Sequence, residues 1–310
     1  MSPAPRRDSP WGLLEVADSH LHFFSHHFYE LLARQAGLAA ASEACARAGV
    51  DPPPEEPQQL AAQWAAELDR HGVARAVLLA SLPGDEPSVA AAVRSHPDRF
   101  FGWFFANPAM PHAAARVEEW LNHGLRGICL LPAMHGYALS DPRVEELIQV
   151  AGRHAAVVFV HCGVLSVGIR ARVGAPSLFD MRFSNPVDLH PLALRHPNVR
   201  FVIPHFGGGY LREALMTASL CPNVYFDTSS SNSWTKYLAP PPTLEQVFER
   251  ALEILGPRRL LFGTDSSFFP RGWVHTVFAR QCEALSRLGI SAQDAQAIFA
   301  GNLLRLMEIP

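Results

Sequence analysis

The residues best suited to do chemistry in this sequence are histidines and one aspartate at the ends of short apolar segments. They are His20 and His22 in VADSHLHFF, His161 after AVVFV, His205 after VRFVIP, and Asp265 after RLLFGT. Imidazole nitrogens and carboxylate oxygens are the usual ligands of zinc-type ions. In a chain with 15 histidines an HxH pair alone is a weak signal. The pattern therefore indicates a metal site only if these segment ends meet in space.

Eight apolar, β-branched or aromatic segments recur along the chain, each separated from the next by a stretch long enough for a helix. They span residues 14–20, 75–80, 100–106, 125–131, 156–161, 199–205, 224–229 and 259–265. This alternation predicts an α/β fold, a (β/α)8 TIM barrel, as a single domain over residues 1–310. The lack of a GxGxxG motif after the first segment disfavours a dinucleotide-binding fold.

A closed barrel would bring the carboxyl ends of all its strands to one mouth, so histidines far apart in the chain could surround one ion. Side chains two apart on a strand share a face, so His20 and His22 should project together. Asp18 is expected on the same face one layer deeper, where it would support the ligands structurally.

Five motifs carry a family resemblance and occur in order along nearly the whole chain. They are DSHLH at 18–22, VFVHCG at 158–163, FVIPHFGG at 201–208, LLFGTDSSFF at 260–269 and IFAGNLLRLM at 298–307. They resemble the amidohydrolase superfamily, in particular the amidohydrolase-2 branch that includes aminocarboxymuconate-semialdehyde decarboxylase. The resemblance implies a zinc-type ion held by His20, His22, His161 and Asp265, with His205 beside the bound water or substrate.

The chemistry of this ligand set favours a metal-dependent enzyme. A zinc-type ion lowers the pKa of a bound water from ~15.7 to about 7. Asp265 would act as general base and then acid, and His205 would polarise a carbonyl or hold an oxyanion. We expect hydrolysis of a small amide, lactone or ester. Non-oxidative decarboxylation of an aromatic or muconate-type acid is the alternative, because the branch that the motifs resemble also contains such decarboxylases with the same ligand set. A barrel without activity is disfavoured because every expected site position is filled.

We expect one metal ion. Two-metal members of the superfamily use a carboxylated lysine, or sometimes a glutamate, at the end of the fourth strand. That segment here, GICLLPAMHG, contains neither, and Lys236, the only lysine, follows the seventh segment. Cys129 could bind metal but is better explained as a packed core thiol. The five scattered cysteines are expected to be free thiols.

Aromatic and basic residues just past the segment ends are candidates for substrate contacts. Phe23, Phe24 and Trp273 are predicted pocket walls, with Phe268 and Phe269 close to Asp265. Of the loop arginines Arg170, Arg172, Arg182 and Arg271, we favour Arg182 and Arg271 as partners for a substrate carboxylate. His135 and Trp234 are weaker pocket candidates.

Two segments exceed what a barrel requires, and both follow strand ends where barrel enzymes bind substrate. Residues 23–70 predict a helical insertion that forms a lid or, alternatively, an interface in a homo-oligomer. Residues 162–190 predict an irregular loop.

The overall composition makes a small molecule the expected partner. The net charge is −3 with dispersed basic residues, which does not suit nucleic acid. There is no apolar run of membrane-spanning length, and the start MSPAPRRDSPW does not resemble a signal peptide. We therefore expect a cytoplasmic protein.

Overall fold

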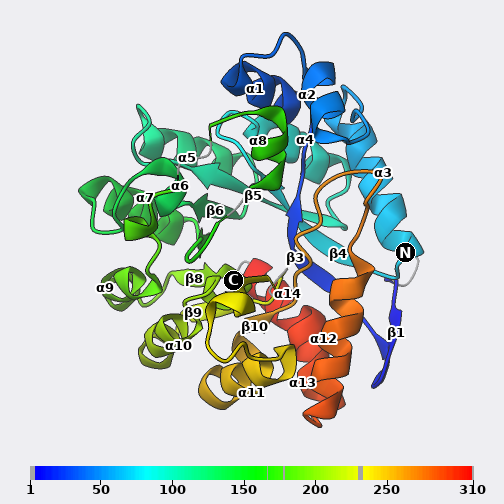
Figure 1. Ribbon diagram of the computed structural model, residues 1–310, viewed down its shortest axis with the longest axis vertical. Helices are drawn as coiled ribbons and strands as arrows, with labels where there is room; N and C mark the ends of the chain where they lie inside the picture. Colours follow the sequence, from blue (N-terminus) through cyan, green and yellow to red (C-terminus); the bar gives the residue numbers. More distant parts are fainter. Residues whose placement is uncertain (1–3, 166, 177–178, 230–232, 309–310) are drawn as a thin grey trace.

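The computed structural model describes residues 4–165, 167–176, 179–229 and 233–308, and its centre is a barrel of eight parallel strands (Figure 1). The strands are β3 (Ala17–His22), β4 (Arg75–Ala80), β5 (Phe100–Ala106), β6 (Gly127–Leu130), β7 (Val157–Val160), β8 (Arg200–Ile203), β9 (Val224–Asp227) and β10 (Leu260–Leu261). Each strand pairs with the next one along the chain. The predicted TIM barrel is confirmed, and each predicted segment contains or overlaps one of these strands.

Backbone hydrogen bonds close the barrel between its first and last strands. Ser19 N donates to Phe262 O at 2.8 Å, and Asp265 N donates to His20 O at 2.9 Å. His22 N donates to Ser266 O at 2.8 Å. The chain therefore continues alongside β3 after β10 has ended, and this path brings Asp265 next to the HxH pair.

An outer layer of helices covers the barrel (Figure 1). It comprises α3 (Pro57–Arg70), α4 (Glu86–Ser95), α5 (Ala113–Asn122), α7 (Pro142–Arg153), α9 (His190–Arg195), α10 (Leu211–Leu220), α11 (Leu244–Leu255) and α12 (His275–Arg287). Local signals set several starts: Thr243 and Gln246 form a capping box at α11, and Pro142 begins α7 after the cap Asp141. The apolar faces of these helices pack on the outward side chains of the strands.

The barrel interior is filled by side chains and is not a pore. Val77, Trp103, Cys129 and Phe159 pack there with the C-terminal helix α14 (Asn302–Met307). That helix follows α13 (Ala292–Gln296) and η6 (Ala297–Gly301) and lies at the centre of the ring of strands in Figure 1. Cys129 is fully buried, which confirms the core thiol, and all five cysteines are free and buried.

Three helices lie over the mouth of the barrel. They are α1 (His26–Ala36), α2 (Ala41–Ala48) and α8 (Gly168–Val173), which share one apolar cluster. Within the segment 23–70, α3 packs on the barrel wall, so α1 and α2 form the part that exceeds a regular barrel.

The remaining elements are short. They are the hairpin β1 (Arg7–Ser9) and β2 (Gly12–Leu14), α6 (Pro132–His135), η1 (Met181–Phe183), η2 (Pro186–Leu189), η3 (Pro204–Gly207), η4 (Ser233–Tyr237) and η5 (Pro257–Arg259). The hairpin takes up Leu14, so the first barrel strand begins later than the predicted residue 14. Among the helices in the described ranges, none has the length and apolar character to cross a bilayer.

Candidate metal centre

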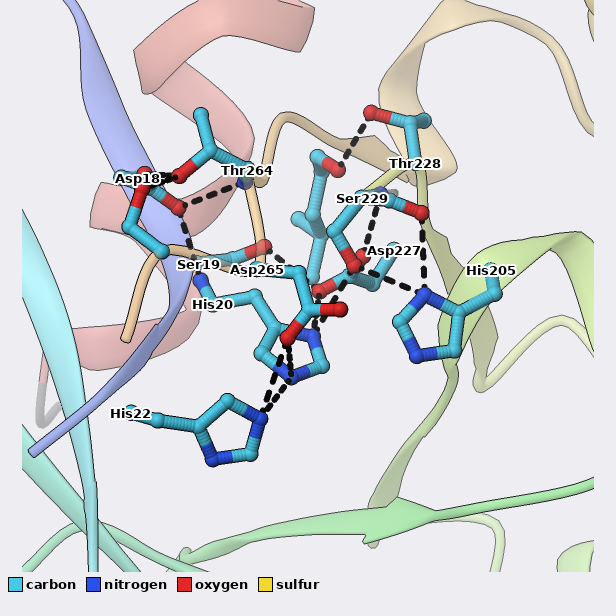
Figure 2. Close-up of polar contacts among 12 residues, drawn as sticks. Asp18, Ser19, His20, His22, His205, Asp227, Thr228, Ser229, Thr264 and Asp265 are labelled. Carbon is cyan, nitrogen blue, oxygen red and sulfur yellow. Dashed lines mark hydrogen bonds and ion pairs between the residues drawn. The ribbon is translucent and has the colours of Figure 1, made fainter. Parts of the chain in front are cut away.

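Three predicted metal ligands converge at the mouth of the barrel (Figure 2). His22 Nε2 lies 3.1 Å from Asp265 Oδ1, and His20 Nε2 lies 3.7 Å from the same oxygen. The two Nε2 atoms are 3.3 Å apart. Ligand atoms bound at about 2.05 Å to a tetrahedral ion are separated by about 3.4 Å. The donor types and their spacing therefore fit one divalent cation.

The two other predicted histidines face the same cavity from the ends of β7 and β8. The ring centroids of His161 and His205 are 5.3 Å apart, and that of His205 is 5.1 Å from His20. His20, His22 and Asp265 form a group with ligand atoms within 4.8 Å of one another. The predicted ligand His161 is outside this group but lines the same cavity. Burial, with the neighbouring imidazoles, holds the pKa of His161 well below its usual value. Its imidazole is therefore neutral at pH 7, as metal ligation requires.

Tight loop geometry positions the residues after β7, β8 and β10. Val164 N donates to Gly208 O at 2.8 Å, and a Cβ on Gly163 would clash with the carbonyls of the loop that carries His205. His205 and Asp265 have positive φ angles of 55° and 58°. Such backbone costs a non-glycine residue on the order of 1–3 kcal/mol and is found mainly at functional sites.

Three residues that were not predicted from the sequence contact the imidazoles at Nδ1. Ser81 Oγ lies 2.6 Å from His22 Nδ1, and Asp227 Oδ2 lies 3.1 Å from His20 Nδ1. The carbonyl oxygen of Ser229 lies 2.9 Å from Nδ1 of His205. All three residues follow or end the predicted strand segments RAVLLAS and VYFDTS. Because strand ends face the mouth of a barrel, this position could have identified them as site residues.

The electrostatics of the cluster favour positive charge. Burial disfavours an imidazolium at His20, but the carboxylates of Asp227, Asp265 and Asp18 together raise the pKa of His20 to about 9. Desolvation opposes ionisation of Asp265, yet the imidazoles of His22 and His20 hold its pKa well below the usual value. The same carboxylates would attract a divalent cation, whose binding would displace the proton.

Asp18 lies away from the ligand cluster (Figure 2). The pairing of β3 with β4 shifts register between Asp18 and Leu21, so strict alternation of faces does not hold there. The prediction that Asp18 shares the face of the two histidines is wrong. Its carboxylate instead accepts hydrogen bonds from Thr264 and from Trp273 Nε1, the latter at 2.8 Å, a structural role. Burial raises the pKa of Asp18 to about 6.

A cavity of about 450 Å³ lies between the cluster, helices α1 and α8, and Val50 just after α2. Its walls include Phe24, Phe28, Phe105, Phe159 and Phe268. The Phe24 and Phe28 rings stack with centroids 4.2 Å apart. Phe24 therefore lies in the cavity wall, as the sequence predicted, and the surface next to the cluster is apolar and aromatic.

Several other predicted contact residues do not reach this cavity. Phe23 is fully buried in the barrel core, and Trp273 is also buried there, with its indole bonded to Asp18. Arg182 is 82% exposed and pairs with Asp180. His135 is half-buried and Trp234 is buried, and neither belongs to the cavity lining. These side chains pack against other elements or face solvent instead of the cavity. Such packing depends on residues distant in the sequence, so the local pattern does not reveal it.

Three arginines line the cavity, and they differ in their partners. Arg170 donates to Gln35 Oε1 and the Pro176 carbonyl, and Arg172 donates to the Ala48 carbonyl. Arg271 lies 5.9 Å from the Phe268 ring centroid and, within the part of the chain that the structure describes, has neither a hydrogen bond nor an ion pair. Arg271 is therefore the cavity cation most available to a ligand.

The barrel with its histidine and aspartate cluster matches a known family. The family model Amidohydro_2, described as amidohydrolase, matches residues 17–308, nearly the entire sequence. The chain belongs to this amidohydrolase family, which confirms the resemblance seen in the motifs. Protein fluG of Emericella nidulans is 38% identical over 87 residues, which are 28% of this chain. The match spans 10% of the length of that relative.

Solved structures share the fold at low sequence identity. The 5-carboxyvanillate decarboxylase LigW from Sphingomonas paucimobilis is 16% identical with a TM-score of 0.66, over 96% of this chain and 100% of that one. A probable 2-pyrone-4,6-dicarboxylic acid hydrolase from Acinetobacter baumannii is 16% identical with a TM-score of 0.63, over 95% and 99%. An amidohydrolase from Burkholderia multivorans with bound zinc is 17% identical with a TM-score of 0.58, over 96% and 100%. The fold thus occurs in both hydrolases and decarboxylases.

Proposed function

We propose that this protein is a hydrolase that uses one divalent ion, zinc by preference, to cleave a small amide, lactone or ester. His20, His22, His161 and Asp265 would hold the ion, which would act as a Lewis acid and lower the pKa of water to about 7. The convergence of His20, His22 and Asp265 on one point beside the cavity carries this proposal.

The residues of the site supply the proton transfers. Asp265 would take a proton from the attacking water and deliver it to the leaving group. His205 reaches the reacting group from the neighbouring strand, because its ring lines the same cavity. Through Nε2 it would accept a proton when neutral and stabilise negative charge when protonated.

The cavity suits a small substrate with an apolar body and a carboxylate. Its volume of about 450 Å³ lies in the range of small-molecule sites, ~300–1,000 Å³. The phenylalanine walls would bind the apolar body, and Arg271 would bind a carboxylate. Helices α1, α2 and α8 would act as a lid that excludes water from the reacting groups.

Non-oxidative decarboxylation of an aromatic or muconate-type acid is the second candidate. The observation that favours it is the aromatic wall beside the cluster, where the Phe159 ring centroid is 5.2 Å from that of His20. A carboxylate held in such surroundings loses hydration, which favours its departure as uncharged carbon dioxide, and Asp265 in its acid form would supply the proton that replaces it on the carbon.

Product analysis separates the two reactions. Zinc-loaded and manganese-loaded enzyme would be incubated with lactones and aryl esters and, separately, with carboxylated phenols. Acid release from the first set supports the hydrolase, and carbon dioxide release from the second set supports the decarboxylase. The variant Asp265→Asn should lose either activity. Full turnover by that variant, or none by loaded wild-type enzyme on any compound, would overturn the proposal.

A further inference from the structure

The end of β9 contacts two imidazoles of the site on the side away from the cavity (Figure 2). Asp227 Oδ2 lies 3.1 Å from His20 Nδ1. Ser229 Oγ lies 3.0 Å from Nδ1 of His20 and 3.0 Å from Nδ1 of His205. The Ser229 carbonyl oxygen lies 2.9 Å from Nδ1 of His205. The segment Asp227–Ser229 therefore contacts each of the two rings at its Nδ1 atom.

The chemistry of these partners determines which ring nitrogen carries the proton. An ionised carboxylate and a backbone carbonyl can accept hydrogen bonds but cannot donate them. Nδ1 of His20 must therefore donate to Asp227, and Nδ1 of His205 must donate to the Ser229 carbonyl. Ser229 Oγ can accept from both rings. In the neutral rings each lone pair then belongs to Nε2, the atom that faces the cluster or the cavity.

Asp227 is itself held in one orientation. Ser229 N donates to its Oδ1 at 2.6 Å, and Ser19 Oγ donates to its Oδ2 at 3.1 Å. The side chain is fully buried, and a Cβ on Gly263 would lie 3.0 Å from Oδ2. The backbone N–H of Ser229 therefore donates to Oδ1 of Asp227, and Oδ2 remains able to accept a hydrogen bond from His20.

We infer that Asp227 and Ser229 are positioning residues that hold His20 and His205 as Nδ1–H tautomers. This arrangement aims the Nε2 lone pair of His20 at the ion and leaves that of His205 free to accept a proton from the reacting group. The part concerning His205 rests on the proposed function, whereas the part concerning His20 concerns metal binding alone. Partners of this kind on metal-binding histidines typically contribute about 10–100-fold to metal affinity.

The variant Asp227→Asn tests the assignment directly. Ser229 N requires an oxygen opposite it, so the asparagine would place its carbonyl there and turn its amide N–H toward His20 Nδ1. That donor favours the opposite tautomer, with the proton on Nε2, which cannot bind metal. Zinc affinity, measured by competition with a chromophoric chelator, should fall about 10–100-fold. In nitrogen-15 NMR spectra of metal-free protein, recorded at a pH where the ring is neutral, His20 should change from the Nδ1–H to the Nε2–H tautomer.

Thr228→Val is the matched control. Thr228 is buried directly after β9, but its hydroxyl donates to Gln281 Oε1 at 2.8 Å and contacts neither imidazole. This variant should lower the melting temperature while zinc affinity stays within about twofold of wild type. A loss of zinc affinity equal to that of Asp227→Asn would show a general folding defect and overturn the inference.

Ser229→Ala examines the contact of Oγ with both rings. It removes Oγ, which lies 3.0 Å from Nδ1 of each ring, but keeps the carbonyl, so zinc affinity should fall less than in Asp227→Asn and kcat should fall with KM little changed. Unchanged zinc affinity in Asp227→Asn would overturn the positioning of His20, and unchanged kcat in Ser229→Ala would overturn that of His205. Because zinc affinity is measured without substrate, a lack of turnover on every compound would contradict the proposed function and leave the His20 assignment standing.

Discussion

Asp85 is a buried carboxyl group beside the start of α1, and its replacement tests the structure independently of any substrate. It lies just before α4 and is fully buried. Its Oδ1 accepts a hydrogen bond from Ser25 Oγ at 2.7 Å, and Ser25 in turn caps α1. Oδ2 has no partner among the residues that the structure describes. Burial raises the pKa of Asp85 to about 7.

The elevated pKa predicts the size and the sign of a pH effect on stability. A folded-state pKa of about 7 against 3.8 in the unfolded chain corresponds to roughly 4 kcal/mol, at about 1.4 kcal/mol per pKa unit. Between these values the folded protein keeps a proton that the unfolded chain releases. The free energy of unfolding therefore falls as pH rises through this window, and above about pH 7 the full cost of the buried charge is present.

The variant Asp85→Asn removes this titration while keeping the shape of the side chain. Urea unfolding of both proteins at pH 5 and pH 8 should show that the variant gains roughly 3 kcal/mol more, relative to wild type, at pH 8 than at pH 5. The exposed Asp98→Asn provides the baseline for a surface carboxylate. An equal difference at the two pH values, or a larger relative loss at pH 8, would refute the assignment of Asp85 as a buried acid.

Three further predictions concern the site. Removal of metal with a strong chelator and dialysis against zinc should restore about one ion per chain and raise the melting temperature; two ions per chain would contradict a mononuclear centre. Ser81→Ala should weaken zinc binding by about 10-fold in chelator competition, because it removes the hydroxyl 2.6 Å from His22 Nδ1, and unchanged affinity would argue against that role. Arg271→Gln should raise the KM for a carboxylate substrate about 10-fold or more and leave the KM for an uncharged ester unchanged. The control Arg182→Gln, at an exposed arginine, should change neither KM. Equal effects of Arg271→Gln on both substrates would exclude a carboxylate contact.

The strands and the positions of the principal site residues could be predicted from sequence because both depend on local order along the chain. Apolar segments separated by helical stretches define a parallel barrel, and in such a barrel strand ends meet at one mouth. His20, His22 and Asp265 stand at those ends, so their convergence followed from position alone. Short hydrogen bonds across the closure then determine the spacing of their ligand atoms.

The direction of each neighbouring side chain could not be predicted in this way. Phe24 lies in the cavity wall while the adjacent Phe23 is buried in the core, and a register shift in β3 moves Asp18 away from the histidines. These outcomes depend on packing against elements distant in the sequence, and a shift of one position in a strand reverses the face that a side chain occupies.

The sequence by itself determined the barrel and the set of groups able to bind a metal ion, because these follow from periodicity and strand-end chemistry, while its motifs carried the resemblance to the family. Only the tertiary structure decided which groups form hydrogen bonds with these candidate ligands. Asp227 and Ser229 are more than 200 and 20 residues from the imidazoles of His20 and His205 that they contact. Direct pairing of β8 with β9 places Ser229 beside His205, whereas Asp227 reaches His20 only because the barrel closes between the β10 segment and β3.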